Sequence, residues 1–311
     1  MNSKKETKIY FDFARHRRKF FLFSALILVL GVVFTLIFGL NAGVDFKSGT
    51  RLDMLINKQF EINDVHAIVE EVVPDVEFEE ITKYGNNKEF ATTTFEQVIE
   101  PAKLTEIEKK LQDKYGPQVT KQESTVDPVI ANEMVNKAVI AVLIASAFIV
   151  VYIAIRFELY FGLACIGALL HDAFIPVAMF SIFRIEVDLT FVAAILTIVG
   201  YSINDTIVIF DRIRENMRTM KCDTIDSIEH MVNVSLWQTM RRSIFTVGTV
   251  FIATVILAIF GSEGIRNFSL ALIFGLVSGT YSSIFIAAQT WIALKERDMK
   301  KKAKLEPTPE A

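Results

Sequence analysis

Long apolar runs without charge constrain this chain more than any other feature. Residues 20–40 form an uncharged run of 21 and residues 138–155 a run of 18, and about 20 apolar residues in a helix span the hydrocarbon core of a bilayer. Further blocks lie at 159–183, 189–210, 243–262 and 267–294. With 52% hydrophobic residues, the chain is too apolar for a soluble enzyme of two domains. The sequence therefore predicts a polytopic α-helical membrane protein with six transmembrane helices.

The placement of basic residues predicts how these helices are oriented. Lysine and arginine gather in three segments, 1–19, 212–242 and 295–311, and all three fall on one side if six spans alternate. By the positive-inside rule that side is the cytoplasm, so both termini are expected there. Residues 41–133 hold 10 basic and 19 acidic residues, a net charge of −9, and are expected outside. The first run exceeds the usual apolar length of a signal peptide, so it should remain as an anchor.

These observations divide the chain into five parts. Residues 1–19 are a cytoplasmic tail, 20–40 the first transmembrane helix, and 41–134 an external domain. Residues 135–294 form a region of five transmembrane helices with a cytoplasmic loop at 212–242, and 295–311 form a basic cytoplasmic tail. This pattern predicts a chain that crosses a membrane several times, with both termini in the cytoplasm.

The external segment shows alternating strand and helix patterns. A strand at 51–56 precedes a helix that Asn63 should cap, and strands at 76–82 and 89–95 flank a turn at 84–87. Pro101 should open a second helix that stops at Gly116, followed by a strand at 119–125. The resulting order, βαββαβ, is the ferredoxin-like arrangement of an α+β domain. This superfold assigns no function, and His66 is expected to be structural or merely exposed.

Ionisable residues inside the spans are the main candidates for function. Each costs at least about 2.5–3.5 kcal/mol on insertion scales and normally faces a protein interior or a water path. Asp205 lies in the fourth span beside Asn204, and a lone buried carboxylate there could exchange protons. His171 and Asp172 lie in the middle of the third span as a plausible relay pair. The alternative for each carboxylate is a hydrogen-bonded residue that only packs helices.

Other residues in the spans carry simpler interpretations. Arg242 heads the fifth span and Asp211 and Arg212 close the fourth, where ordinary snorkelling to the interface also explains them. Gly275 and Gly279 form a Gly-x-x-x-Gly pattern in the sixth span. Together with serines 278, 282 and 283 they predict a close-packing surface rather than chemistry.

Cofactors, metals and nucleic acid are not expected. Cys165 and Cys222 give neither a disulfide framework nor the spacing of a metal site. The external segment contains no Ser-His-Asp, Cys-His or phosphate-loop pattern, so hydrolytic chemistry is not predicted. The basic clusters lie next to membrane spans, and topology explains them without nucleic acid.

Several short strings resemble one known family. Residues 43–50 (GVDFKSGT) are similar to the signature that follows the first span in the bacterial SecD and SecF translocation subunits. Residues 200–206 (GYSINDT) with 210–216 (FDRIREN) resemble the fourth span of the SecF branch, and strings at 170–172, 233–236, 239–242 and 279–283 agree. The signature residues carried over are Gly43, Asp45, Phe46, Gly49, Thr50, Asp211 and Arg212. Ser48 departs from the glycine common in the family, and its β-carbon restricts positive φ.

The resemblance implies a non-enzymatic subunit of the Sec export machinery. It implies a heterodimer with SecD, in which each partner supplies six spans of the resistance-nodulation-division type, attached to the SecYEG channel, with YajC and YidC as further partners. The pair would lie among the lipids of the bacterial cytoplasmic membrane. It would use the proton motive force to draw preproteins outward after the ATP-driven stage. By position, Asp205 matches the family's carboxylate for proton passage and Arg242 the arginine that answers its charge. Together with the polar residues of the spans discussed above, this predicts an ion-coupling set of Asp205, Arg242, Asn204, Asp172 and His171.

Three functional classes stay open on the sequence alone. Besides the export subunit, the fold would serve a half-transporter for a small solute or lipid, or a passive scaffold whose buried charges hold helices together. Protons and sodium ions are not distinguished either, since Asp, Asn, Ser and Tyr oxygens serve both.

Overall fold

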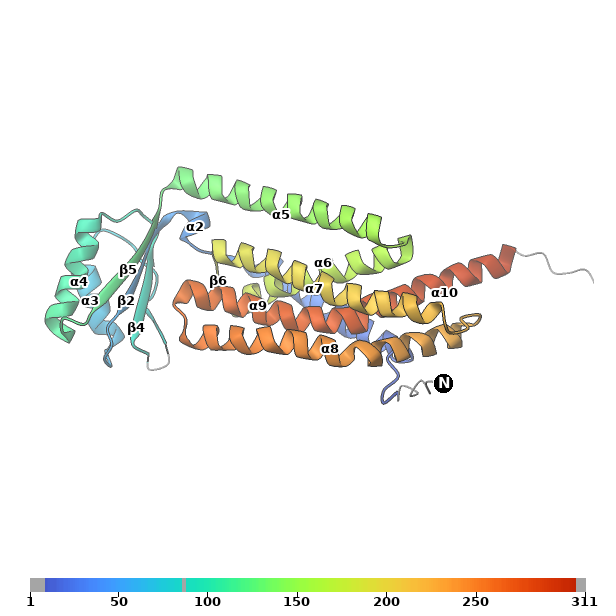
Figure 1. Cartoon of the computed structure of the whole chain (residues 1–311). Helices are drawn as coiled ribbons and strands as arrows, with labels where there is room; N and C mark the ends of the chain where they lie inside the picture. The colour runs from blue at the N-terminus through green and yellow to red at the C-terminus, as the bar shows by residue number, and fades with distance from the viewer. Residues whose placement is uncertain (1–8, 86–87, 306–311) are drawn as a thin grey trace, which may run out of the picture.

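A helical bundle and a small sheet domain lie end to end in the computed structural model, which describes residues 9–85 and 88–305 (Figure 1). The sheet domain, residues 49–126, sits at one end of the bundle, and the beginning of α1 and α10 lie toward the other end. We call these the domain end and the basic end of the bundle. The predicted turn at 84–87 falls partly on residues 86–87, which lie outside the described residues, as do parts of the predicted tails.

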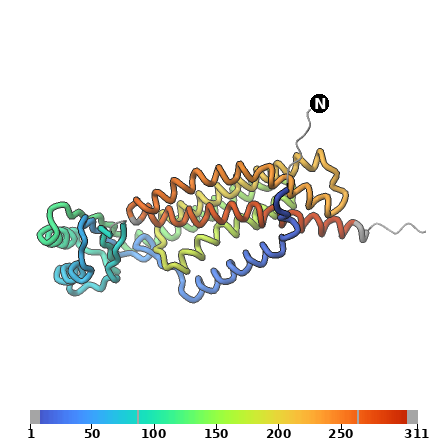
Figure 2. Tube along the Cα trace, turned by 90° about the horizontal axis from the view of Figure 1, so that it is seen from below, coloured from blue at the N-terminus to red at the C-terminus, as the bar shows by residue number. Residues whose placement is uncertain are grey.

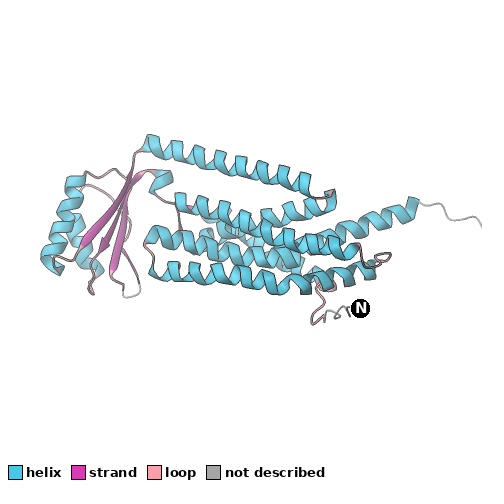
Figure 3. Ribbon diagram, in the orientation of Figure 1, coloured by secondary structure: helices cyan, strands magenta, loops and turns pink. Residues whose placement is uncertain are grey.

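The sheet domain is built from strands β2 (Gly49–Leu55), β3 (Thr82–Tyr84), β4 (Phe90–Phe95) and β5 (Thr120–Val126), with helices α3 (Ile62–Val72) and α4 (Pro101–Tyr115). The strands lie in the order β3-β4-β2-β5 and every neighbouring pair is antiparallel. Both helices cover the face of the sheet turned away from the bundle (Figure 3). Alternate residues of β2, including Leu52 and Met54, are buried against these helices.

The elements of the sheet domain follow the predicted order, with shifts at two places. Helix α3 begins at Ile62 with Glu61 as its N-cap, so Asn63 lies inside the first turn and does not cap it. The predicted strand 76–82 makes a single bridge, Phe78 to Phe95, before β3 starts at Thr82. Helix α4 begins at Pro101 as predicted, because proline is favoured in the first turn.

In the described part of the chain, six helices are long and apolar enough to cross a membrane, as the sequence predicts. They are α1 (Arg17–Phe38), α5 (Pro128–Arg156), α6 (Leu159–Phe183), α7 (Leu189–Met217), α8 (Ile225–Phe260) and a last span in three parts. The last span runs from α9 (Glu263–Ser282) through a π-helical turn, η1 (Ser283–Ala287), into α10 (Ala288–Leu305). Helix α5 starts before its apolar run and α7 starts at the first residue of its run. Asp127 and Asp188 are the N-caps of these two helices and set where they begin.

The predicted cytoplasmic loop at 212–242 is mostly helix. Helix α7 continues to Met217, α8 begins at Ile225, and Thr224 and Ser227 form a capping box at its start. Uncharged runs do not mark this part of the helix, because this stretch of α8 is amphipathic. Ile228, Met231, Val232 and Leu236 recur at helical spacing and are buried in the bundle core.

Part of the predicted N-terminal tail is also packed. Phe13 and Ala14 are buried, and both backbone N–H groups donate to Asn233 Oδ1, at 2.9 and 3.3 Å. Trp237 Nε1 donates to the carbonyl of Phe11 at 3.1 Å. The segment before α1 therefore docks on the extension of α8 rather than trailing free.

The helices differ strongly in how much of each is buried. The apolar window of the last span is 61% buried, whereas that of α5 is 6% buried. Helix α1 packs on α6 (Figure 2). The approach is close, since a Cβ at Gly31 would lie 2.5 Å from the Cβ of Ala178. The core of the bundle thus consists of α6, α7, the last span and the first part of α8, whereas α1, α5 and residues 244–260 of α8 present apolar side chains outward.

Candidate functional site

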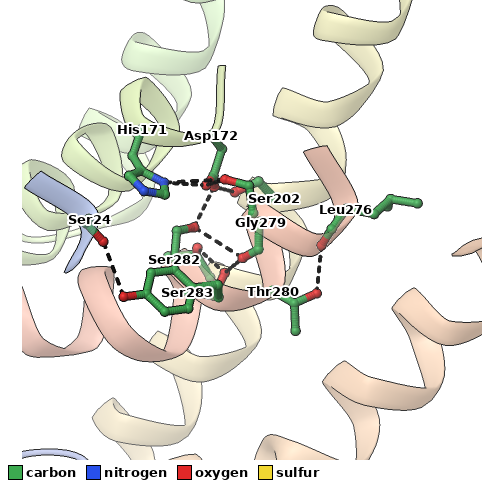
Figure 4. Close-up of polar contacts among 12 residues, drawn as sticks. Ser24, His171, Asp172, Ser202, Leu276, Gly279, Thr280, Ser282 and Ser283 are labelled. Atoms are coloured by element: carbon green, nitrogen blue, oxygen red, sulfur yellow. Dashed lines mark hydrogen bonds and ion pairs between the residues drawn. The ribbon is translucent and has the colours of Figure 1, made fainter. Parts of the chain in front are cut away.

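The carboxylate of Asp172 lies at the centre of a polar cluster in the bundle core (Figure 4). It is fully buried on α6 and accepts from Ser278 Oγ at 2.8 Å and Ser282 Oγ at 2.5 Å, both on α9. Ser202 on α7 donates to the same carboxylate. Three hydroxyls from two other helices therefore satisfy Asp172, as buried charges require.

His171 belongs to the same cluster. Adjacent helical residues point to different faces, yet His171 Nδ1 lies 3.0 Å from Asp172 Oδ1, so the structure brings the predicted pair together. The ring is also 3.4 Å from Ser278 Oγ and stacks on Tyr281 with centroids 6.2 Å apart. The imidazole is thereby fixed beside the carboxylate.

Asp205 lies on α7 in a different environment. Its side chain is 8% exposed, and Oδ1 accepts from Ser243 Oγ of α8 at 2.5 Å. By distance and angle, Oδ2 has no hydrogen-bond partner among the described residues, although Ser283 and Arg242 lie near enough to act on the carboxylate. A cavity of about 10 Å³ adjoins it, lined by residues of α7, α8 and α9 that include Tyr201, Gly275 and Gly279. That volume is close to the least that holds one water molecule.

Hydroxyl groups lie between the two carboxylates. Ser202, which binds Asp172, is three positions before Asp205 on α7. Thr206, next to Asp205, exchanges a hydrogen bond of 2.9 Å with Ser283, the neighbour of Ser282. Ser283 opens the π-helical turn, a local irregularity that is frequent at functional sites.

The serines of the last span add polar contacts to the predicted packing surface. Ser278 and Ser282 of α9 bind Asp172, and Ser283 of η1 binds Thr206. Their spacing of four residues placed Ser278 and Ser282 on one helix face, which was the available signal. Ser243 gave no signal, because its partner lies 38 positions away.

Two predicted members of the site lie at its outer edge. Asn204 and Arg242 are both exposed. In the described part of the chain no ion pair joins Arg242 to Asp205, but the charge of Arg242 acts on that carboxylate, and Arg242 is the neighbour of Ser243, which binds Asp205. Both side chains are therefore available at the surface of the bundle near this carboxylate.

Gly275 and Gly279 lie where α9 crosses α7. A Cβ at Gly275 would lie 2.3 Å from Ile198, and one at Gly279 would lie 3.3 Å from the Cβ of Ser202. The close approach brings the serines of α9 within reach of Asp172.

The signature segment after α1 joins the sheet domain to the domain end of the bundle. Gly43 follows β1 (Asn41–Ala42), which pairs in parallel with β6 (Glu186–Val187), and it caps the short helix α2 (Val44–Lys47). Asp45 Oδ2 accepts from the N–H of Leu189 at 2.9 Å, at the start of α7. Phe46 packs on the apolar cluster of α6, α7 and α9. These residues fix the start of the site-bearing helix.

The second half of the signature begins strand β2. Gly49 has φ +124°, and a Cβ there would lie 2.2 Å from the carbonyl oxygen of Phe95. Thr50 Oγ1 accepts from the N–H of Ile99 at 2.9 Å. Ser48 adopts φ 72° and ψ 167°, a region occupied almost solely by glycine. A residue with a β-carbon thus occupies a position with a strained backbone.

Asp211 and Arg212 lie at the basic end of α7. Asp211 accepts from Arg156 Nη2 at 2.8 and 2.7 Å, which ties the end of α7 to the end of α5. Arg212 pairs with Glu215 on its own helix at 2.8 Å. Among the described residues, no group of three His, Cys, Asp or Glu side chains is placed to hold a metal ion.

Known proteins resemble this chain over most of its length. A family model described as protein export membrane protein SecD/SecF, C-terminal, matches residues 106–297. The protein translocase subunit SecF of Alicyclobacillus acidocaldarius is 48% identical over 96% of this chain and 99% of its own. The subunit SecDF of Bacillus subtilis is 44% identical over 93% of this chain, which spans 39% of that protein.

A solved structure agrees with these relatives. The crystal structure of SecDF from Thermus thermophilus, described as a translocon-associated membrane protein, matches with a TM-score of 0.79 and 31% identity. The match covers 92% of this chain and 39% of that one. The chain belongs to the SecD/SecF family of protein-export membrane proteins.

Proposed function

We propose that this chain is an auxiliary subunit of the Sec protein-export machinery that couples an ion gradient to the late stages of preprotein translocation. The observation that carries the coupling is the bare Oδ2 of Asp205 beside a water-sized cavity in the bundle. Burying an ionised carboxylate with one oxygen unsatisfied is costly, so this group is suited to bind and release a cation. In this proposal the other polar residues of the bundle fix the helices around Asp205.

The roles of the remaining candidates follow from their contacts. Asp172, His171 and their serine donors hold α6, α7 and α9 in one arrangement. Ser243 orients the carboxylate of Asp205. Arg242 and Asn204 lie on the outer surface, where a polar side chain in a membrane needs a protein partner or water. We therefore place them against SecD, with Arg242 answering the charge state of Asp205.

Partnership with SecD is supported by the SecDF relatives, in which a region like this chain makes up 39% of a longer chain. The outward apolar faces of α1, α5 and α8 leave room for a second set of helices. By the family resemblance, the pair attaches to the SecYEG channel, with YajC and YidC as further partners. We take the sheet domain to be ferredoxin-like and external, on the grounds of strand order and charge.

The orientation is tested with single cysteines. Lys109→Cys on α4 should react with an impermeant thiol reagent added outside intact cells, and Thr219→Cys, between α7 and α8, should react only after the cells are opened. The reverse pattern would overturn the orientation.

The coupling is tested by preprotein translocation into membrane vesicles with and without a proton or a sodium gradient. Asp205→Asn should keep the ATP-driven part and lose the part that the gradient stimulates. Glu215→Gln, an exposed acid on the same helix, is the matched control and should retain the stimulation. Normal stimulation in Asp205→Asn would refute the mechanism, and the ion whose gradient is effective identifies the coupling ion.

A further inference from the structure

The segment before α1, residues 9–16, carries aromatic side chains outward at the basic end of the bundle. Its backbone is held on α8 by Asn233 and Trp237, and the Phe13 ring is buried. The side chains of Tyr10 and Phe11 point outward instead, and they are 77% and 41% exposed. Large apolar groups that stay exposed on a firmly docked segment mark a surface for a partner outside the bundle.

The rings of this docked segment continue onto the two spans beside it. The Tyr10 ring meets the Trp237 ring edge-on, with centroids 5.2 Å apart, and the Phe11 ring centroid lies 6.3 Å from that of Phe20. Phe20 is the first residue of the apolar run of α1. The aromatic surface therefore lies where the apolar part of the span begins, which is the depth at which tyrosine and tryptophan gather in membrane proteins.

Lys19 lies at the same depth on α1. It is exposed, and it is followed at three, four and seven positions by Leu22, Phe23 and Leu26, which are exposed as well. This spacing places the four side chains on one face of the helix. The ammonium group of Lys19 therefore ends an outward apolar face, where its stem covers apolar surface and its charge reaches the headgroups.

Arg241 has the matching place on α8. Trp237, Arg241 and Phe245 follow one another at intervals of four residues, so they lie on one helix face. The guanidinium of Arg241 lies 5.5 Å from the centre of the Phe245 ring, which is exposed within the apolar run that starts at Ser243. One exposed cation therefore ends the outward apolar face of each helix, and the docked segment connects the two helices.

Other arginines at this end face acidic groups of the protein. Arg17 pairs with Glu229 and with Glu296, the latter at 2.7 Å. The charge of Arg18 also acts on Glu296, and Arg15 lines a cavity of about 370 Å³ that contains Glu229 and two further carboxylates. These three arginines are therefore balanced within the protein.

Lys19 and Arg241 differ from these arginines. Within residues 9–85 and 88–305, neither of them forms an ion pair. The acidic group of the docked segment, Asp12, is held on the inner side, where it accepts from Asn233 Nδ2 at 2.7 Å. The outward surface thus combines two unpaired cations with exposed aromatic rings.

We propose that Lys19 and Arg241, with the rings of Tyr10, Phe11 and Trp237, form a binding surface for anionic lipid headgroups. The two cations bind the negative charge of the headgroup, and the rings lie among the headgroups with their polar atoms toward water. A zwitterionic headgroup brings its own cation, so it gains less from the same surface. This surface is independent of the ion-coupling role of Asp205 and of which leaflet it meets.

The lipid contact is measured through the fluorescence of Trp237. The chain has two tryptophans, and the other, Trp291, is buried and stacks on Phe161, so Trp291→Phe leaves Trp237 as the only reporter. The full chain is placed in vesicles of equal parts phosphatidylcholine and phosphatidylglycerol, with bromine on the acyl chains of one lipid or of the other. Bromine quenches tryptophan fluorescence on contact.

Brominated phosphatidylglycerol should quench Trp237 at least about twofold more strongly than brominated phosphatidylcholine, because each cation near an anionic headgroup strengthens the association. The excess should shrink in about 1 M salt, which screens exposed charges. Equal quenching by the two lipids, or no quenching by either, would overturn the proposal.

Matched charge variants separate this surface from the total charge of the basic end. Lys19→Gln combined with Arg241→Gln should make the two lipids quench almost equally. Lys221→Gln combined with Lys301→Gln removes two exposed cations from the same end of the bundle and should keep the excess. If the second pair abolished the excess as fully as the first, total charge would select the lipid and the proposed surface would be wrong. Asp205→Asn should keep the excess, whatever its effect on gradient-stimulated translocation.

Discussion

Asp172 and Asp205 lie on neighbouring helices of one bundle, yet their carboxylates meet different surroundings. Asp172 is fully buried and accepts from three serine hydroxyls, with His171 beside it. Asp205 accepts from one serine, and its second oxygen adjoins a water-sized cavity. The number of donors, rather than depth alone, separates the two groups.

The difference assigns them different tasks. A carboxylate whose two oxygens both accept hydrogen bonds from other helices holds α6, α7 and α9 together, because removing it leaves several donors unsatisfied. A carboxylate with a bare oxygen beside a space for water is suited to exchange a cation. The scaffold interpretation therefore fits Asp172, and the coupling interpretation fits Asp205.

The largest expected effect is on the stability of an Asp172 variant. Asp172→Asn replaces an acceptor oxygen with an amide that faces serine donors, so it should lower the free energy of unfolding by about 3 kcal/mol. Asp205→Asn should change it by less than about 1 kcal/mol. Unfolding in mixed detergent micelles measures both. Equal losses in the two variants would remove the distinction between the carboxylates.

The next effect comes from separating α7 and α9. Gly275→Leu meets Ile198 and should cost about 2 kcal/mol by overpacking. It should also disrupt the bonds from α9 to Asp172 and leave the α7–α8 bond of Asp205 to Ser243 intact. Gly248→Leu, at a glycine with open space around it, is the matched control. A Gly275→Leu protein as stable as the Gly248→Leu protein would show that α9 is not held tightly.

A smaller effect is expected from a single donor. Ser282→Ala removes one hydroxyl from the charged Asp172 and should cost about 1.5 kcal/mol. Ser269→Ala, on the same helix, removes a hydroxyl that bonds only the backbone of its own helix at Ile265, so it should cost much less. Thermal unfolding of both variants in detergent gives the comparison. Identical losses would mean that the Asp172 network adds nothing beyond ordinary helix packing.

The number of spans and the order of elements in the sheet domain could be predicted from the sequence, because both depend on local patterns of apolar and polar residues. Hydropathy marked the six apolar runs, and alternation with turn residues marked the strands. It did not reveal that residues 225–236 extend α8, because an amphipathic stretch lacks an uncharged run. Nor did it show that Asn233 would bind the backbone of the segment before α1.

The candidate site was accessible from the sequence only in part. An ionisable residue within an apolar span is rare and costly, so the sequence alone marks Asp172 and Asp205 as candidates. The difference between the surroundings of the two carboxylates could not be predicted, because it depends on which helices pack against α6 and α7. Ser278 and Ser282 looked like packing residues, and the contact of Ser243 with Asp205 depends on the α7–α8 crossing.

The smallest effect on stability is expected from Arg242, and it tests whether Asp205 has a counter-charge. Arg242 is exposed and forms no ion pair with Asp205 in the described part of the chain, so Arg242→Ala should change the free energy of unfolding by less than about 0.5 kcal/mol. If it answers the charge of Asp205 in the assembled complex, the variant should lose part of the gradient-stimulated translocation, and less than Asp205→Asn does. Arg241→Ala, the exposed neighbour that lies over the ring of Phe245, is the control and should keep full stimulation. Equal activity of the two arginine variants would leave Asp205 to act without Arg242, and the counter-charge would then have to come from SecD.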